Sequence, residues 1–117
     1  MNYIDGVVLA VPKENKAAYI KHAKMTAEIF KDYGALSIVE CWGDDIPDGV
    51  STSFPIAVKC KSNEAVCFSW ISWPSREVRN EAIKKIKKDP RMELGDGEIP
   101  FDGKIMIFGG FDVVLNL

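Results

Sequence analysis

Residues 66–92, VCFSWISWPSREVRNEAIKKIKKDPRM, join an aromatic-rich strand to a charged amphipathic helix and decide the fold. Residues 66–73 are apolar or aromatic on both alternating sets, interrupted only by serines. A strand with one solvated side alternates apolar with polar residues, so we expect this strand to be covered on both faces. Pro74 cannot continue the strand ladder, and Ser75 is a good N-cap for the helix that follows.

The helix predicted after Ser75 has one narrow apolar stripe within a charged surface. The stripe consists of Val78, Ala82, Ile83 and Ile86. This spacing is typical of a helix that buries one side against a sheet. We expect the helix to end at Asp89-Pro90, because the residue before a proline disfavours helical backbone.

The N-terminal part of the chain repeats this strand and helix pattern. Residues 2–11 are mostly apolar on both alternating sets and predict a first strand. Residues 13–33 predict a long helix, since residues suited to a buried stripe recur every three or four positions. That stripe comprises Tyr19, Ala23, Thr26, Phe30 and Tyr33. Gly34 stands where a left-handed residue often ends a helix, and residues 35–43 predict the second strand.

The segment between the second strand and residue 66 has a weaker pattern. Residues 44–50 predict a turn from their Asp, Pro and Gly content. Residues 51–63 fit either a short helical turn or a short extra strand, because apolar residues alternate there while Pro55 opposes a central strand.

The C-terminal part predicts a loop and a closing strand. Residues 93–103 are rich in glycine, and residues 104–114 form the last strand candidate. Gly109 and Gly110 lie in its middle, where they indicate a bulge or the close approach of another backbone.

The order of these elements, strand-helix-strand twice, predicts an α+β fold. We expect a ferredoxin-like βαββαβ sandwich with a four-stranded antiparallel sheet and two helices on one face. All the candidate strands are apolar on both sides, and a large bare apolar sheet face marks an interaction site. We therefore expect a homodimer that stacks sheet on sheet about a twofold axis.

Length and composition exclude several classes of protein. The 117 residues with 47% hydrophobic content fit one domain spanning residues 1–117. A net charge of −2 gives no basic excess for nucleic acid, and no apolar run has the length of a membrane span.

Cys41, Cys60 and Cys67 form no CxxC pair, so we expect free thiols in a reducing cytoplasm. A single histidine opposes a zinc or non-haem iron site, and we expect no metal and no cofactor.

Four phrases carry a family resemblance: VECWGDDIPDG at 39–49, VCFSWISWPSREVR at 66–79, KDPRM at 88–92 and PFDGKIMIFGGF at 100–111. They resemble the bacterial YbaA-like family, a domain of unknown function in the dimeric α/β-barrel superfamily. The resemblance covers nearly the whole chain and implies a ferredoxin-like fold with a barrel formed by two protomers. It implies no activity, because the superfamily contains cofactor-free monooxygenases, haem-degrading enzymes, isomerases, dye peroxidases and proteins without known chemistry.

Glu40 is the first candidate for acid-base chemistry. It alternates with Leu36, Ile38 and Trp42 in the second strand, and a carboxylate among apolar side chains is costly unless it is paired. It is a candidate general base with a raised pKa. The alternative is an ion pair with Arg76, Arg79 or a lysine of a partner chain.

Asp5 and His22 are the other candidate proton-handling residues. Asp5 interrupts the first strand as Glu40 interrupts the second, and a contact between the two carboxylates across neighbouring strands is one arrangement. His22 lies beside the buried stripe of the first helix, and some superfamily enzymes resemble this in using a histidine as proton shuttle or haem ligand. The alternative is a partly buried structural histidine.

Aromatic residues provide the candidate ligand site. Trp42, Trp70, Phe68 and Tyr19 would line a pocket for a small flat hydrophobic ligand, or else belong to the core and the dimer interface. Arg91 would bind an anion, or else fix its loop through an ion pair.

Two functions follow from this sequence. The first is a cytoplasmic homodimer that acts as a ligand-binding or accessory protein. The second is a cofactor-free enzyme, similar to a monooxygenase or an isomerase, acting on a small flat hydrophobic substrate in a pocket within each protomer. A pocket that contains Glu40 or His22 would favour the second.

Overall fold

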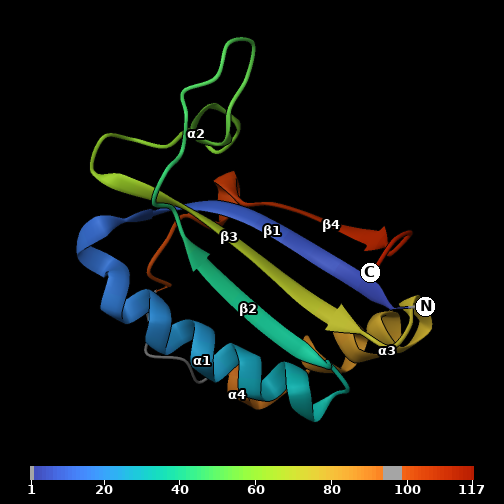
Figure 1. The fold of residues 1–117 in the computed structure, drawn as a ribbon. Helices are drawn as coiled ribbons and strands as arrows, with labels where there is room; N and C mark the ends of the chain where they lie inside the picture. The colour runs from blue at the N-terminus through green and yellow to red at the C-terminus, as the bar shows by residue number, and fades with distance from the viewer. Residues whose placement is uncertain (1, 94–98) are drawn as a thin grey trace.

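The computed structural model describes residues 2–93 and 99–117, which form a four-stranded sheet with helices (Figure 1). The strands are β1 (Tyr3–Pro12), β2 (Ser37–Trp42), β3 (Glu64–Trp73) and β4 (Ile107–Asp112). The helices are α1 (Lys16–Asp32), α2 (Phe54–Ala57), α3 (Arg76–Ile86) and α4 (Pro90–Glu93), with 3₁₀ turns η1 (Lys13–Asn15) and η2 (Gly103–Ile105). The predicted α+β class is confirmed.

The strands lie in the order β2-β3-β1-β4, and every neighbouring pair is antiparallel. β1 and β3 pair along their whole lengths, from Tyr3 opposite Trp73 to Pro12 opposite Glu64. In this order the two longest strands, β1 and β3, are central, and the shorter β2 and β4 form the edges.

One side of the sheet, called the helix face below, packs under α1 and α3 (Figure 1). Its core residues alternate along the strands, as period-two geometry requires. They include Tyr3, Leu9 and Val11 of β1 and Cys67 and Trp73 of β3, which pack with Tyr19, Ile29, Ala82 and Ile86 of the helices. In α3, Ala82 and Ile86 of the predicted stripe are buried, whereas Val78 is 36% exposed.

The other side of the sheet, called the open face below, carries the second apolar set. Phe68, Ile107 and Phe111 are 42%, 45% and 60% exposed there. At the C-terminal end of β1 this face is covered by residues 43–63, called the arm below, where Val58 is fully buried against Ala10 and Val66. The arm with α2 extends on the side of the sheet away from α1 and α3 (Figure 1).

Local signals for helix ends are confirmed. The Ser75 side chain accepts a hydrogen bond of 3.1 Å from the Val78 N–H, which caps α3. Gly34 follows α1 with a φ of +109°. In the arm, Ser53 caps α2 through the Ile56 N–H, so the helical-turn alternative for this segment is confirmed and the extra strand is wrong.

Several boundaries differ from the prediction. Residues 13–15 form the 3₁₀ turn η1 before α1, and residues 103–105 form η2, so β4 begins later than expected. α3 ends at Ile86, and Pro90 opens the short helix α4, where its missing N–H costs nothing. Residues 94–98 of the predicted loop lie outside the described residues.

The predicted bulge at Gly109-Gly110 is wrong. Pairing of β1 with β4 is uninterrupted, with Gly6 opposite Gly109 and Asp5 opposite Gly110. Side chains, and not another backbone, approach this strand closely, because the Tyr3 hydroxyl and the Arg79 guanidinium occupy the place of a Cβ atom on Gly110.

Candidate functional site

The predicted site residues lie in separate parts of the fold. Tyr19, His22, Glu40 and Trp42 lie at the helix face between α1 and β2. Asp5 lies under α3, Arg91 lies at α4, and Phe68 and Trp70 lie on the open face.

Tyr19, predicted as a ligand-binding residue, contacts Glu40, the candidate general base. The Tyr19 hydroxyl donates a hydrogen bond of 2.6 Å to Oε1 of Glu40. Tyr19 is 6% exposed, and the Trp42 and Phe101 rings lie 6.2 and 5.9 Å from its own ring, centroid to centroid. Glu40 itself is an exposed residue of an edge strand, so part of its side chain contacts solvent, whereas its carboxylate lies against the buried Tyr19.

Burial controls the electrostatics of this pair. Desolvation raises the pKa of Glu40, and hydrogen bonds from Tyr19 and Ser69 oppose the rise. Burial and the neighbouring Glu40 carboxylate raise the pKa of Tyr19 well above its ordinary value. Desolvation, with Glu40 nearby, raises the pKa of the buried Cys67 thiol to about 12. Tyr19 and Cys67 therefore stay protonated at neutral pH.

His22 lies beside this pair without joining it. Its ring packs edge-on against Phe101 with centroids 5.7 Å apart, and desolvation lowers its pKa. The contact with Phe101 favours the interpretation of His22 as a partly buried structural histidine. Its role as a proton shuttle stays a prediction.

Asp5 belongs to a second cluster. Its carboxylate accepts hydrogen bonds from Trp73 Nε1 at 2.9 Å and from Arg79 Nε at 3.1 Å. Arg79 also donates to the Tyr3 hydroxyl at 3.2 Å and lies over the Tyr3 ring. The predicted ion pair between Glu40 and Arg79 is therefore wrong.

The predicted contact between Glu40 and Asp5 is also wrong. Both carboxylates are on the helix face, but β3 lies between their strands. Glu40 pairs opposite Ser69, and Asp5 pairs opposite Ile71.

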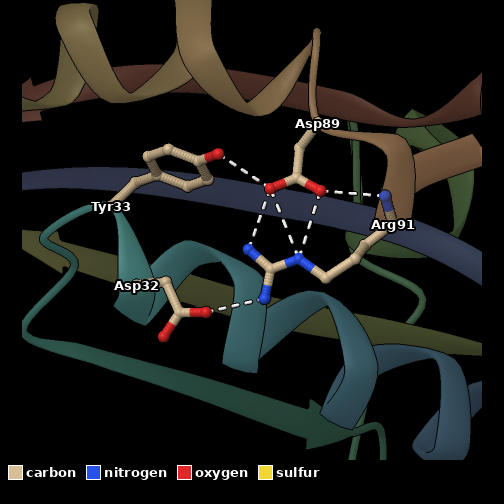
Figure 2. Close-up of polar contacts among 4 residues, drawn as sticks. All are labelled: Asp32, Tyr33, Asp89 and Arg91. Carbon is tan, nitrogen blue, oxygen red and sulfur yellow. Dashed lines mark hydrogen bonds and ion pairs between the residues drawn. The ribbon is translucent and has the colours of Figure 1, made fainter.

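Arg91 is held by two carboxylates (Figure 2). Its Nη1 lies 2.6 Å from Asp32 of α1, and its Nη2 lies 2.8 Å from Asp89. Asp89 also accepts a hydrogen bond of 2.7 Å from the Tyr33 hydroxyl, and Arg91 and Tyr33 hold the pKa of this carboxyl well below its usual range. This geometry favours the loop-fixing interpretation of Arg91 over anion binding.

A hollow of about 670 Å³ lies on the open face. Phe68 and Trp70, predicted as ligand-binding residues, line it. The other lining residues are Ile4, Gly6, Val7, Val8, Ile107, Phe108, Gly109, Phe111, Asp112, Val113, Val114 and Leu115. Gly6 and Gly109 were not predicted from the sequence as residues of a ligand site. They pair across β1 and β4 and leave room for the Phe111 ring beside them. Only the register of the two strands reveals that these glycines meet.

A smaller hollow of about 300 Å³ lies between the arm and the sheet. Cys41, Trp42, Phe54 and Phe68 are among its lining residues. Phe68 therefore lines both hollows.

Residues 2–93 and 99–117 contain neither a membrane-spanning helix nor a group of side chains suited to a metal ion. No helix there is long and apolar enough to cross a membrane. No three His, Cys, Asp or Glu side chains come together there in a group suited to a metal ion.

Comparison with known proteins identifies relatives along the whole chain. Residues 2–103 match the family described as "Protein of unknown function (DUF1428)". The "Uncharacterized protein YbaA" of Escherichia coli strain K12 is 52% identical over 116 residues, covering 99% of each chain, and YbaA of Shigella flexneri gives the same values. Among solved structures, the de novo designed protein Foldit4 has a TM-score of 0.46 at 10% identity, covering 97% of this chain and 99% of that chain. The chain therefore belongs to the DUF1428 family, in which it is similar to the bacterial YbaA proteins.

Proposed function

We propose that this protein is a homodimer that binds a small, flat, apolar ligand on the open face, as a binding or accessory protein. The hollow on that face carries the proposal. Its 670 Å³ falls within the roughly 300–1,000 Å³ range of ligand pockets, and Asp112 is the one charged residue among the described residues that line it. A flat apolar molecule would contact Phe68, Trp70 and Phe111 without leaving a polar group unpaired.

The apolar surface of the open face supports the dimer. The strand order β2-β3-β1-β4 with helices on one side supports a ferredoxin-like sandwich, and we propose that two such sandwiches form a dimeric α/β barrel. Phe68, Ile107 and Phe111, 42–60% exposed in one protomer, would be covered by the partner's open face. The free Cys41, Cys60 and Cys67 fit a reducing cytoplasm.

The position of the proton-handling residues favours binding over catalysis. Glu40, Asp5 and His22 lie on the helix side of the sheet, so the sheet separates them from the hollow. A general base must reach the proton that it removes, within about 3 Å or through one water. A ligand in the hollow is out of that reach.

A fluorescence titration with N-phenyl-1-naphthylamine, an uncharged flat probe, tests the ligand site. We expect saturable binding with one site per protomer. Gly109→Val should weaken binding at least about tenfold, because its side chain would fill the floor of the hollow while the Cβ atom makes only ordinary contact with Phe111. Gly103→Val is the matched control, since a Cβ atom there meets nothing within 4 Å. Equal affinity of the two variants would overturn the ligand site.

Light scattering after size exclusion tests the dimer. We expect twice the chain mass of 13.0 kDa at micromolar concentration. A monomer at every concentration measured would overturn the dimer.

A second candidate is a cofactor-free enzyme that uses Glu40. The 2.6 Å hydrogen bond from Tyr19 and the raised pKa of Glu40 favour it, because a carboxylate whose pKa is raised toward the operating pH suits general acid-base work. Oxygen uptake with a dihydroxynaphthalene tests a monooxygenase-like activity. Glu40→Gln should abolish uptake and Glu28→Gln, on the surface of α1, should not; an unchanged rate in Glu40→Gln would contradict this role.

A further inference from the structure

Asp48 and Gly49 lie in a turn of the arm, in a stretch between β2 and α2 that forms neither helix nor strand. Both residues are exposed. Gly49 has a φ of +70°, a conformation that residues with a side chain rarely adopt. A Cβ atom there would also collide with the carbonyl oxygen of Thr52. The turn therefore requires glycine at position 49.

A glycine that follows an aspartate makes the aspartate chemically labile. The backbone nitrogen of the following residue can attack the side-chain carboxyl carbon and close a five-membered succinimide ring. A side chain on the following residue shields that nitrogen, and a β-branched side chain does so most. Glycine leaves the nitrogen open, so the residue that the turn requires is also the one that exposes Asp48 to this reaction.

The Asp48 carboxylate has no hydrogen bond or ion pair within the part of the chain that the structure describes. It can therefore rotate toward the Gly49 nitrogen. The Asp-Gly pair at residues 102–103 is arranged differently, although it is also exposed. Oδ1 of Asp102 accepts a hydrogen bond of 2.9 Å from the Lys104 N–H, which caps η2. This bond holds the Asp102 carboxylate at the Lys104 nitrogen.

The Asp-Gly pair at residues 5–6 is held more firmly. The Asp5 carboxylate accepts hydrogen bonds from Trp73 at 2.9 Å and from Arg79 at 3.1 Å. Gly6 lies within the central strand β1 and pairs with Trp70 on one side and Gly109 on the other. Ring closure there would require the sheet to open.

Asp45 separates the effect of the following residue from the effect of exposure. It is exposed in the same segment of the arm, and among residues 2–93 and 99–117 it has no hydrogen bond or ion pair. Its following residue, however, is the β-branched Ile46, which shields the nitrogen. Of Asp5, Asp45, Asp48 and Asp102, Asp48 alone combines an unheld carboxylate with an open nitrogen.

We infer that Asp48 is a site of spontaneous covalent modification, at which the folded protein converts aspartate to isoaspartate. The Gly49 nitrogen forms a bond to Cγ of Asp48, the Cγ–OH bond breaks, and the hydroxyl leaves with the nitrogen proton as water. Water then opens the ring. Breaking the new N–Cγ bond restores aspartate, whereas breaking the original peptide bond leaves the main chain running through the side chain. The inference is independent of the proposed ligand site and dimer.

Ageing of the folded full-length protein at neutral pH tests this inference. Trypsin releases Asp5, Asp48 and Asp102 in separate peptides, residues 1–13, 32–59 and 92–104, and Asp45 accompanies Asp48. Electron-transfer fragmentation locates each isoaspartate, and it also distinguishes position 102 from the Asp-Gly pair at 96–97, which lies outside the described residues. Isoaspartate should form at position 48 at least about tenfold faster than at positions 5, 45 and 102. An equal or higher rate at any of these three would overturn the inference.

The same measurement in urea separates the effect of the fold from that of the sequence. Unfolding removes the capping hydrogen bond of Asp102, so Asp102 and Asp48 should isomerise at comparable rates. Asp45 should stay slow, because Ile46 still follows it. A difference between Asp48 and Asp102 that persists unchanged in urea would contradict protection by the cap.

Asparagine variants provide a second test, because the same ring closure then expels ammonia and changes the mass of the peptide. Asp48→Asn should deamidate at least about tenfold faster than the matched control Asp45→Asn, which alters an equally unheld side chain of the arm. Circular dichroism verifies that both variants are folded. Equal rates of deamidation would overturn the assignment of Asp48.

Discussion

Tyr19 of α1 donates a hydrogen bond of 2.6 Å to Glu40 of β2 and thereby joins the first helix to an edge strand. The donor is buried and the acceptor belongs to an exposed residue, so the bond lies at the boundary of the core. This hydrogen bond requires a protonated Tyr19 hydroxyl, because ionised tyrosine has no proton to donate.

We expect Tyr19 to make stability sensitive to alkali. Its pKa in the folded protein is raised above the ordinary value of 10.0, so above that pH the unfolded chain releases a proton that the folded chain retains. The free energy of unfolding should therefore fall as pH rises above about 10. Urea midpoints between pH 8 and 11 should show this fall in the parent protein and a smaller one in Tyr19→Phe. Equal slopes for both proteins would contradict the assignment.

Glu40 should produce a second pH dependence at lower pH. Its folded pKa is raised from 4.5, so the folded protein binds more protons than the unfolded chain as pH rises from 4.5 toward the folded value. Its contribution to stability is therefore greatest at low pH and decreases through that window. Glu40→Gln should remove this decrease, and Glu28→Gln should retain it.

Asp89 should make the free energy of unfolding depend on pH in the direction opposite to that of Glu40. Arg91 and Tyr33 depress its pKa below the ordinary 3.8, so its stabilising contribution is present above pH 3.8 and is lost as the pH falls through the folded value. Asp89→Asn should unfold at a lower temperature at pH 7 and show a weaker acid dependence than the parent protein. Asp45→Asn, at an exposed position of the arm, is the control and should follow the parent curve.

Gly110 should be intolerant of a side chain. A Cβ atom there would collide with the Tyr3 hydroxyl and with the Arg79 guanidinium, which Asp5 and Asn80 hold in place. Gly110→Ala should destabilise the protein by about 1–3 kcal/mol, the usual cost of overpacking. Gly109→Ala, whose Cβ atom would lie 3.7 Å from Phe111, should be nearly neutral in the same chemical denaturation experiment. Equal effects at both glycines would refute the steric explanation.

We expect Ser75 to contribute about 1 kcal/mol to the free energy of unfolding, since its side chain caps α3 by accepting a hydrogen bond from the Val78 N–H. Ser75→Ala should lower the urea midpoint by a corresponding amount. Ser62→Ala, at an exposed position, should leave the midpoint unchanged.

The elements of this fold were predictable because their signals are local. The Ser75 cap and the left-handed Gly34 each depend on a few consecutive residues, and both are confirmed. The two apolar sets of β1 and β3 likewise predicted a sheet with two apolar faces, since alternation along a strand needs no knowledge of its neighbours.

The partners of the charged residues were not predictable in the same way. The sequence suggests that Glu40 meets Arg76, Arg79, a lysine of a partner chain or Asp5. In the structure β3 lies between β1 and β2, and Arg79 binds Asp5. Tyr19 is recognisable as a buried residue of the first helix, yet its bond to Glu40 depends on how the helix lies on the sheet. Phe68 and Trp70 of the hollow were predicted as ligand-binding residues, but the two glycines were not, because their meeting requires the register that sets Gly6 opposite Gly109.

The strand order has a consequence for how the chain folds. Of the four described strands, β1 is synthesised before the others and is central, and its two neighbours, β3 and β4, come from residues 64–73 and 107–112. Both edges of β1 therefore stay unpaired until much of the protein has left the ribosome, and contacts between distant residues such as Tyr3 and Asp112 complete the sheet. Such high contact order slows folding, and a long apolar strand with two bare edges is prone to pair with other chains. We therefore expect nascent copies of this protein to be most prone to aggregation before β4 has paired with β1.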